Sequence, residues 1–175
     1  MKNEVKIWVT TDTHFGHEKI KEYCHRPEDF EDRILKGLEV VGEEDILIHL
    51  GDFCWEDNEE WHKKFFKAVK ARRTILVRGN HDNKKRNWYM AHGWSFTCNW
   101  FLSKYFGKTI LFSHMPAQAL GISKKLYDIN VHGHSHDSGS PDHHGIVYKK
   151  RWKQKLVSIE NLGYKPILLK TLLGQ

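Results

Sequence analysis

The sequence predicts an α/β fold, and three of its features lead to that prediction. Short apolar segments with strand character alternate with longer segments whose apolar residues recur at helical spacing. Such alternation is typical of βαβ units with parallel strands, at least in the first half of the chain. Five predicted strands also run directly into a cluster of Asp, Asn or His. Because ligands of such sheets bind beyond the carboxyl ends of the strands, we expect these clusters to meet at one edge.

Strands and helices alternate regularly in the first half. Three short apolar strands are predicted, at 6–10, 45–50 and 74–77. The helices predicted between them occupy 18–24, 28–40 and 58–70. Pro27 separates the first two helices, since proline interrupts helical hydrogen bonding. The third helix has an amphipathic pattern, and Asp57 or Asn58 supplies its N-cap.

The second half of the chain contains more strand and less helix. A short helix is expected at 83–92, followed by strands at 95–101, 108–112 and 129–131. Two further segments, 145–148 and 156–159, are predicted to form a closing hairpin. The final apolar pair, Leu172 and Leu173, is expected to be frayed or only weakly docked.

Size and composition indicate one soluble domain. A chain of 175 residues fits a single domain, 1–175, and is too short for two ordinary ones. No apolar run approaches the roughly 20 residues that span a bilayer, and the first residues lack the apolar core of a secretory signal. We therefore expect a cytoplasmic protein without a membrane partner.

Three composition features narrow the function. The cysteines Cys24, Cys54 and Cys98 form no CxxC pair, which favours buried or half-buried thiols in a reducing compartment. A net charge of +6 favours anionic partners, although solvated surface charge explains it equally well. The 13 histidines are more informative, because imidazole is the commonest metal ligand.

The five strand-terminal clusters carry the chemistry. In chain order they are Asp12-Thr13-His14, Gly51-Asp52, Gly79-Asn80-His81-Asp82, Ser113-His114 and Gly133-His134-Ser135-His136. Taken singly, each is also ordinary turn or capping chemistry, because Gly, Asn and Asp favour such positions. The last cluster is the most informative single piece, since two histidines at i and i+2 on a strand end can face one centre.

Together and in this order, the clusters resemble the calcineurin-like metallophosphoesterases, in particular their small bacterial and phage members that lack a cap. The resemblance spans Asp12 to His136. The chain resembles these small members further in the segment 12–17 and in the later segment 160–166. It implies two mixed β-sheets packed as a sandwich, flanked by helices, with a dimetal site at one edge. Phosphate-ester hydrolysis suits such a site, because two divalent ions about 3.5–4 Å apart activate water and clamp the phosphoryl oxygens.

The resemblance also implies a role for each residue. Asp12, His14 and His136 would bind the first metal ion, Asn80, His114 and His134 the second, and Asp52 would bridge the two. This nitrogen-rich set does not suit Mg²⁺ or Ca²⁺ alone and indicates two divalent transition-metal ions, manganese first, with iron, zinc or nickel as alternatives. His81 would lie over the phosphate, stabilising charge or protonating the leaving oxygen. Asp82 would orient His81, or would simply cap a helix.

The other histidines and one basic segment have weaker assignments. His17 could contact substrate or a metal ligand, or lie on the surface. The rest divide into two predicted core residues, His49 and His132, two possible substrate contacts, His143 and His144, and three surface residues, His25, His62 and His92. In the segment 148–155 cations alternate with aromatics, which fits either a nucleic-acid surface that includes Lys149 and Arg151 or a solvated hairpin.

The predicted activity is hydrolysis of phosphodiesters, phosphomonoesters or both, with a slight preference for diesters. The substrate could be a nucleotide or nucleic acid, and one alternative is a nuclease or an enzyme that processes nucleic-acid ends. A second alternative is a non-catalytic binding module on the same scaffold, which some members of this family have become by losing ligands. The complete ligand set argues against that alternative. The sequence does not predict an oligomeric state.

Overall fold

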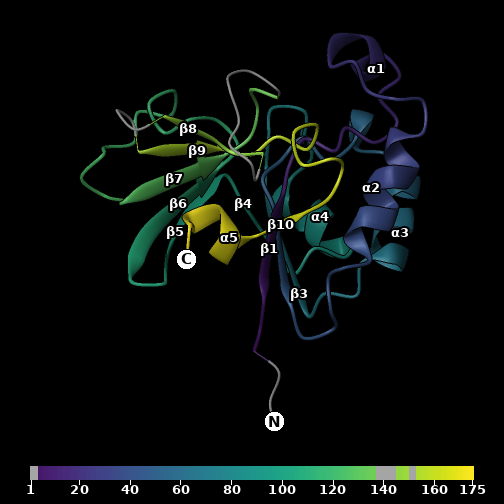
Figure 1. Ribbon diagram of the computed structural model, residues 1–175. Coiled ribbons are helices and arrows are strands. Elements are labelled where there is room, and N and C mark those ends of the chain that lie inside the picture. Colours follow the sequence, from purple (N-terminus) through teal and green to yellow (C-terminus); the bar gives the residue numbers. More distant parts are fainter. Residues whose placement is uncertain (1–3, 137–144, 150–152) are drawn as a thin grey trace.

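The computed structural model describes residues 4–136, 145–149 and 153–175 and contains two five-stranded mixed sheets with flanking helices (Figure 1). The first sheet has the strand order β10-β1-β2-β3-β4 and the second β5-β6-β7-β9-β8. This arrangement confirms the predicted two-sheet α/β fold.

The first sheet is built by the βαβ units of the first half of the chain. Its parallel strands are β1 (Ile7–Thr10), β2 (Ile46–His49), β3 (Arg73–Val77) and β4 (Phe96–Cys98). A strand from the end of the chain, β10 (Ile167–Leu168), pairs antiparallel with β1. The helices of this half are α1 (Ile20–Tyr23), α2 (Phe30–Leu38), α3 (Glu59–Ala68) and α4 (Arg86–Ala91).

The second sheet has a parallel centre and antiparallel edges. Its central strands are β6 (Lys108–Ser113), β7 (Ile129–His132) and β9 (Gln154–Leu156). Antiparallel β5 (Trp100–Tyr105) and β8 (Val147–Lys149) form its edges. The β8–β9 pair confirms a closing hairpin, but β9 shares only Leu156 with the strand predicted at 156–159.

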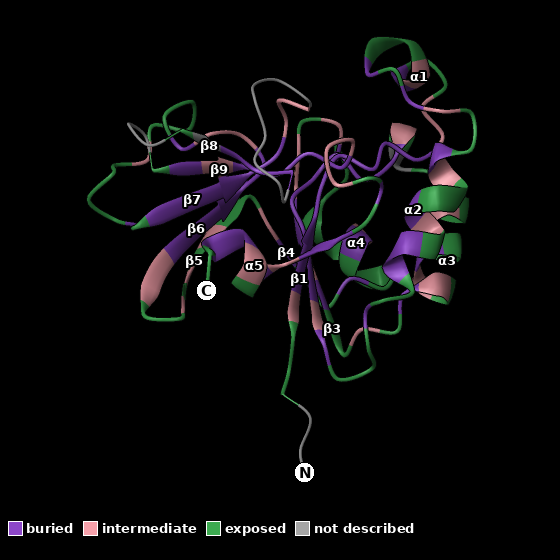
Figure 2. Ribbon diagram, viewed as in Figure 1, coloured by how far each residue is buried: buried purple, intermediate pink, exposed green. Residues whose placement is uncertain are grey.

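Alternating side chains on the first sheet build two separate cores. Trp8, Leu47 and Leu76 pack with residues of α2, α3 and α4. Their neighbours Val9, Ile48 and Val77 pack instead against side chains of the second sheet. Successive residues of a strand point to opposite faces, so a strand buried on both faces reads as a continuous apolar run. Figure 2 shows the central strands buried, the edge strand β5 partly exposed, and the helices exposed on their outer sides.

The single strand predicted at 95–101 is wrong, because it is two strands in different sheets. β4 ends at Cys98 and pairs with β3, whereas β5 begins at Trp100 and pairs with β6. At the junction, the Asn99 side-chain oxygen accepts a 2.6 Å hydrogen bond from the Arg78 guanidinium. The sequence shows no break there, because the strand pattern continues through the crossing.

Two further expectations are corrected by burial. Leu172 and Leu173 are not frayed: they belong to helix α5 (Leu169–Leu173) and are buried in the core between the sheets. His62 is not a surface residue, since it is 1% exposed and accepts a 3.2 Å hydrogen bond from the Trp94 indole. Asn58, by contrast, is confirmed as the N-cap of α3, because its side chain accepts a hydrogen bond from the Glu60 amide.

Candidate metal centre

The five polar clusters follow the carboxyl ends of β1, β2, β3, β6 and β7, three strands of the first sheet and two of the second. Backbone hydrogen bonds join the first two clusters: the Asp12 amide donates to Gly51 O at 2.9 Å and the His14 amide to Asp52 O at 3.0 Å. From the second sheet, the His134 amide donates to Asp12 Oδ2 at 3.0 Å. The clusters therefore converge where the two sheets meet.

The side chains of these clusters form two groups that share Asp52. In the first, His14 Nε2 and His136 Nε2 each lie 3.9 Å from Asp12 Oδ1, and His14 Nε2 lies 3.6 Å from Asp52 Oδ2. In the second, His114 Nε2 lies 3.3 Å from Asp52 Oδ2. Asn80 Oδ1 and His134 Nδ1 each lie 3.1 Å from the same His114 nitrogen. The structure thus brings together all seven side chains for which the sequence predicts a metal-binding role.

The backbone at these positions is strained. Five of the seven residues have φ in the left-handed region, which costs a non-glycine residue about 1 kcal/mol or more: Asp12 (49°), His14 (47°), Asp52 (52°), His134 (69°) and His136 (45°). The neighbouring glycines leave no room for larger residues. A Cβ atom on Gly79 would overlap the Asp52 carboxylate, and one on Gly133 would overlap the Asp12 carboxylate. Strain concentrated in this way is typical of functional sites.

Among the residues that the structure describes, several buried polar atoms of the centre have no hydrogen-bond partner, which tests whether a metal ion would fit. Asp12 Oδ1 and both ring nitrogens of His14 are such atoms, and leaving them unpaired is unfavourable. Burial lowers the pKa of His14, so its imidazole is neutral, as a metal ligand must be. Burial would raise the pKa of Asp52, but His114 and His14 hold it well below its usual range. Burial would lower the pKa of His114 and His136, but hydrogen bonds and neighbouring carboxylates raise it to about 9 and about 10, so a metal ion would displace a proton from each. Carboxylates and imidazoles facing one another suit a divalent transition metal.

His136 is held by a buried ion-pair network that sequence analysis missed. Its Nδ1 lies 3.0 Å from Glu160 Oε1, which also accepts hydrogen bonds from Arg26 Nε (2.9 Å) and Nη2 (2.6 Å). The Arg26 guanidinium, fully buried, donates further to the backbone oxygens of Asp12 and Thr13. Burial would raise the pKa of Glu160, but His136 and Arg26 hold it at about 2. Only the presence of Glu160 in the segment 160–166 hinted at this role in the sequence.

Replacing Glu160 by glutamine should weaken metal binding without removing a ligand. The neutral amide no longer orients His136 as a charged acceptor, and loss of such an outer partner typically costs about 10–100-fold in metal affinity. Calorimetric titration of metal-free protein with Mn²⁺ measures the change. Glu28→Gln, which alters an exposed carboxylate paired with Lys21, serves as the control. An unchanged affinity in Glu160→Gln would show that His136 needs no such partner.

Asp82 has a different position from the one predicted. Its carboxylate accepts hydrogen bonds from the amides of Asp52 (2.9 Å), Phe53 (3.1 Å) and Gly79 (2.7 Å). It does not cap α4, whose N-cap residue is Lys85, and no hydrogen bond joins it to the His81 ring in the described part of the chain. Asp82 thus ties the loop after β2 to the loop after β3, and burial raises its pKa to about 6.

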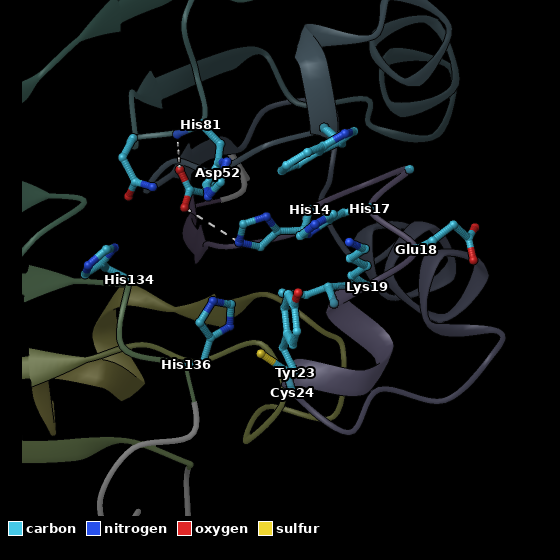
Figure 3. A pocket seen from close by; sticks show the side chains of 14 residues that line it. His14, His17, Glu18, Lys19, Tyr23, Cys24, Asp52, His81, His134 and His136 are labelled. Atoms are coloured by element: carbon cyan, nitrogen blue, oxygen red, sulfur yellow. Dashed lines mark hydrogen bonds and ion pairs between the residues drawn. The ribbon is translucent and has the colours of Figure 1, made fainter.

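His81 and His17 both face an open cavity of about 830 Å³ beside the metal centre (Figure 3). The His81 amide donates to Asp52 Oδ1 at 2.9 Å, and its ring lies 5.3 Å from the His14 ring. The His17 ring stacks on Trp55 at 4.1 Å with an interplanar angle of 4°. His49 and His132 are fully buried, which confirms them as core residues.

The predicted substrate contacts in the second half are placed only in part. Lys149 is exposed at the end of β8 and does not line the cavity. Arg151, His143 and His144 lie outside the described residues. Among the helices that the structure describes, none has the length and apolar character needed to cross a bilayer.

Comparison with solved structures gives the same fold. A protein of unknown function from Aquifex aeolicus, AQ665, superposes with a TM-score of 0.75 at 27% identity, covering 98% of this chain and 99% of its own. YfcE, a phosphoesterase from E. coli, has a TM-score of 0.52 at 17% identity, covering 88% of this chain and 78% of its own. An archaeal phosphodiesterase has a TM-score of 0.51 at 19% identity, covering 88% and 82% of the two chains.

Sequence comparison identifies the family. The protein MJ1445 of Methanocaldococcus jannaschii, described only as uncharacterized, is 28% identical over 174 residues, covering 94% of this chain and 87% of its own. The sequence profile of the calcineurin-like phosphoesterases matches residues 5–169 and so includes all five clusters. The chain therefore belongs to the calcineurin-like phosphoesterase family.

Proposed function

We propose that this protein hydrolyses phosphodiesters, phosphomonoesters or both with two divalent transition-metal ions. The observation that carries the proposal is the pair of ligand groups that share the Asp52 carboxylate. When bound, two such ions lower the pKa of water and neutralise charge on the phosphoryl oxygens. Family membership supports a metal-dependent phosphoesterase, and the two-metal mechanism is our inference from the side-chain arrangement.

The positions of the residues suggest which of them would bind each metal ion and which would contact the ester. Asp12, His14 and His136 would bind one ion, and Asn80, His114 and His134 the other, with Asp52 between them. Four imidazoles, two carboxylates and one amide form a mixed nitrogen and oxygen set that suits manganese, iron, zinc or nickel, and we take manganese as the first candidate. His81, on the cavity side, would donate a hydrogen bond or a proton to an oxygen of the ester. This role favours diesters slightly, because alkoxide leaving groups need a proton.

Metal loading and turnover on simple esters test the proposal together. Metal-free protein incubated with Mn²⁺ and freed of excess ion should hold two ions per chain by elemental analysis. It should then hydrolyse nitrophenyl phosphate or bis-nitrophenyl phosphate, with Mn²⁺, Ni²⁺ and Zn²⁺ compared against Mg²⁺. One ion per chain would refute the dinuclear site. Two ions without turnover on either ester would favour a non-catalytic binding module.

That the substrate is a nucleic acid stays a prediction. Lys149 is exposed, as a polyanion contact would need to be, but it lies away from the residues that line the cavity. A nuclease remains the alternative to an enzyme that acts on small substrates. Short RNA and DNA should be included in the same substrate screen. The cytoplasmic location predicted from the sequence also stays a prediction.

A further inference from the structure

One wall of the cavity beside the metal centre has a composition that phosphate binding does not require. His17, Tyr23 and Trp55, which we call the aromatic corner, line it together with Lys19 and Ile20. A phosphate group needs cations and hydrogen-bond donors, and the metal centre with His81 already offers these. Flat rings at the same cavity are placed to contact the part of a substrate that is esterified to the phosphate.

The aromatic corner contains a fixed platform and an exposed ring. His17 and Trp55 stack face to face at 4.1 Å with nearly parallel planes. The Tyr23 ring lies 6.3 Å from His17, tilted by 64°, and Tyr23 is 66% exposed, among the most exposed large side chains described. Figure 3 shows Tyr23, from α1, and Lys19, the residue that precedes this helix, beside the cavity. Two aromatic planes at a steep angle allow a third flat ring to stack on one and contact the edge of the other.

The position of the corner relates it to the reacting phosphate. The His17 ring lies 5.6 Å from the ring of His14, a predicted metal ligand, and 6.3 Å from His81. The His17 side of the corner therefore lies directly beside the residues that would hold the phosphate, and Tyr23 lies on the far side of His17 from them. At the rim, Lys19 contributes a positive charge, whereas Glu18 forms an ion pair with Lys21 at 2.6 Å. The corner thus combines stacking surface with a cation, a pairing that suits a nucleobase linked to phosphate.

We propose that the aromatic corner is a base-binding subsite and that the substrate is a nucleoside phosphate ester. This inference rests on the proposed phosphoesterase function and adds the class of substrate. Stacking depends on the flat face of the base, so the subsite accepts more than one base. Tyr23 is the main contact, because its ring is exposed at the cavity while His17 and Trp55 already cover each other.

Substrate pairs that differ only in the base test the subsite. Adenosine 5′-monophosphate is compared with ribose 5-phosphate, and adenosine 2′,3′-cyclic phosphate with the 2,3-cyclic phosphate of methyl riboside. For whichever pair is hydrolysed, kcat/KM should be about 10–100-fold higher for the substrate with the base. Tyr23→Ala should bring this ratio close to one through a higher KM, and Tyr23→Phe should preserve it. Phe106→Ala, which removes an exposed ring outside the cavity, should preserve it too.

Competition supplies a second readout that does not depend on cleavage of the nucleotide. Adenosine should inhibit hydrolysis of an alkyl phosphate ester more strongly than ribose does, and Tyr23→Ala should remove the difference. Equal kcat/KM values within a pair, or an equal loss for both substrates in Tyr23→Ala, would overturn the subsite while leaving the phosphoesterase intact. Absence of turnover on nitrophenyl esters as well would instead refute the proposed function.

Discussion

Replacing Asp52 by asparagine should reduce turnover by more than about 100-fold and lower the metal content below two ions per chain. Asp52 Oδ2 lies 3.6 Å from His14 Nε2 and 3.3 Å from His114 Nε2, so one carboxylate serves both proposed ions. Loss of an outer partner alone typically costs about 10–100-fold, and loss of a shared anionic ligand should cost more. The amide keeps the size of the side chain, so the effect should come from the lost charge.

Elemental analysis after Mn²⁺ loading and kcat/KM on a nitrophenyl ester measure this effect. Circular dichroism should show the native fold in the variant, which separates loss of metal from loss of structure. Asp32→Asn makes the same chemical change at an exposed position of α2 and should retain two ions and full turnover. If Asp52→Asn held two ions and turned over normally, the bridging role would be wrong.

Replacing His81 by alanine should instead lower turnover while leaving metal content unchanged. The His81 backbone is anchored to Asp52 Oδ1, and its ring lines the cavity. A donor at that position would meet the charge that develops on the phosphoryl or leaving oxygen. Removal of one such preorganised donor typically costs about 10²–10³-fold in kcat. The loss should be larger for an alkyl or ribosyl leaving group, which needs a proton, than for nitrophenolate.

His81 could also be a metal ligand, and the same experiment distinguishes this role from that of a hydrogen-bond or proton donor. A ring nitrogen of His81 comes within 4.8 Å of ligand atoms of His14 and Asp52, close enough to take part in metal binding. Metal content is therefore measured alongside kcat on one nitrophenyl and one alkyl ester. His92→Ala, in which a histidine stacked on Trp88 is removed outside the cavity, is the control. A variant that loses an ion would make His81 a ligand, and equal losses on both esters would remove its leaving-group role.

The strand-end pattern made the gathering of these side chains predictable from sequence. Each cluster is local, because an apolar strand leads directly into its polar residues, as β1 leads into Asp12 and His14. Parallel strands of one sheet place their carboxyl ends at the same edge, which predicts that the three clusters of the first sheet meet, and likewise the two of the second. The packing of the two sheets then brings both sets together. The strands themselves were recognisable because burial on both faces makes them continuous apolar runs.

Other features depend on which distant segments lie side by side. Only the tertiary structure decides those features. The crossing from the first sheet to the second at Asn99 follows from strand pairing and not from local propensity. Leu172 and His62 are buried because other elements cover them. Arg26 and Glu160 are 134 positions apart, so neither residue alone reveals the network that holds His136. The sequence by itself determined the strand ends and the chemistry they carry, since both are local, whereas long-range packing decided how those ligands are held and what lines the cavity beside them.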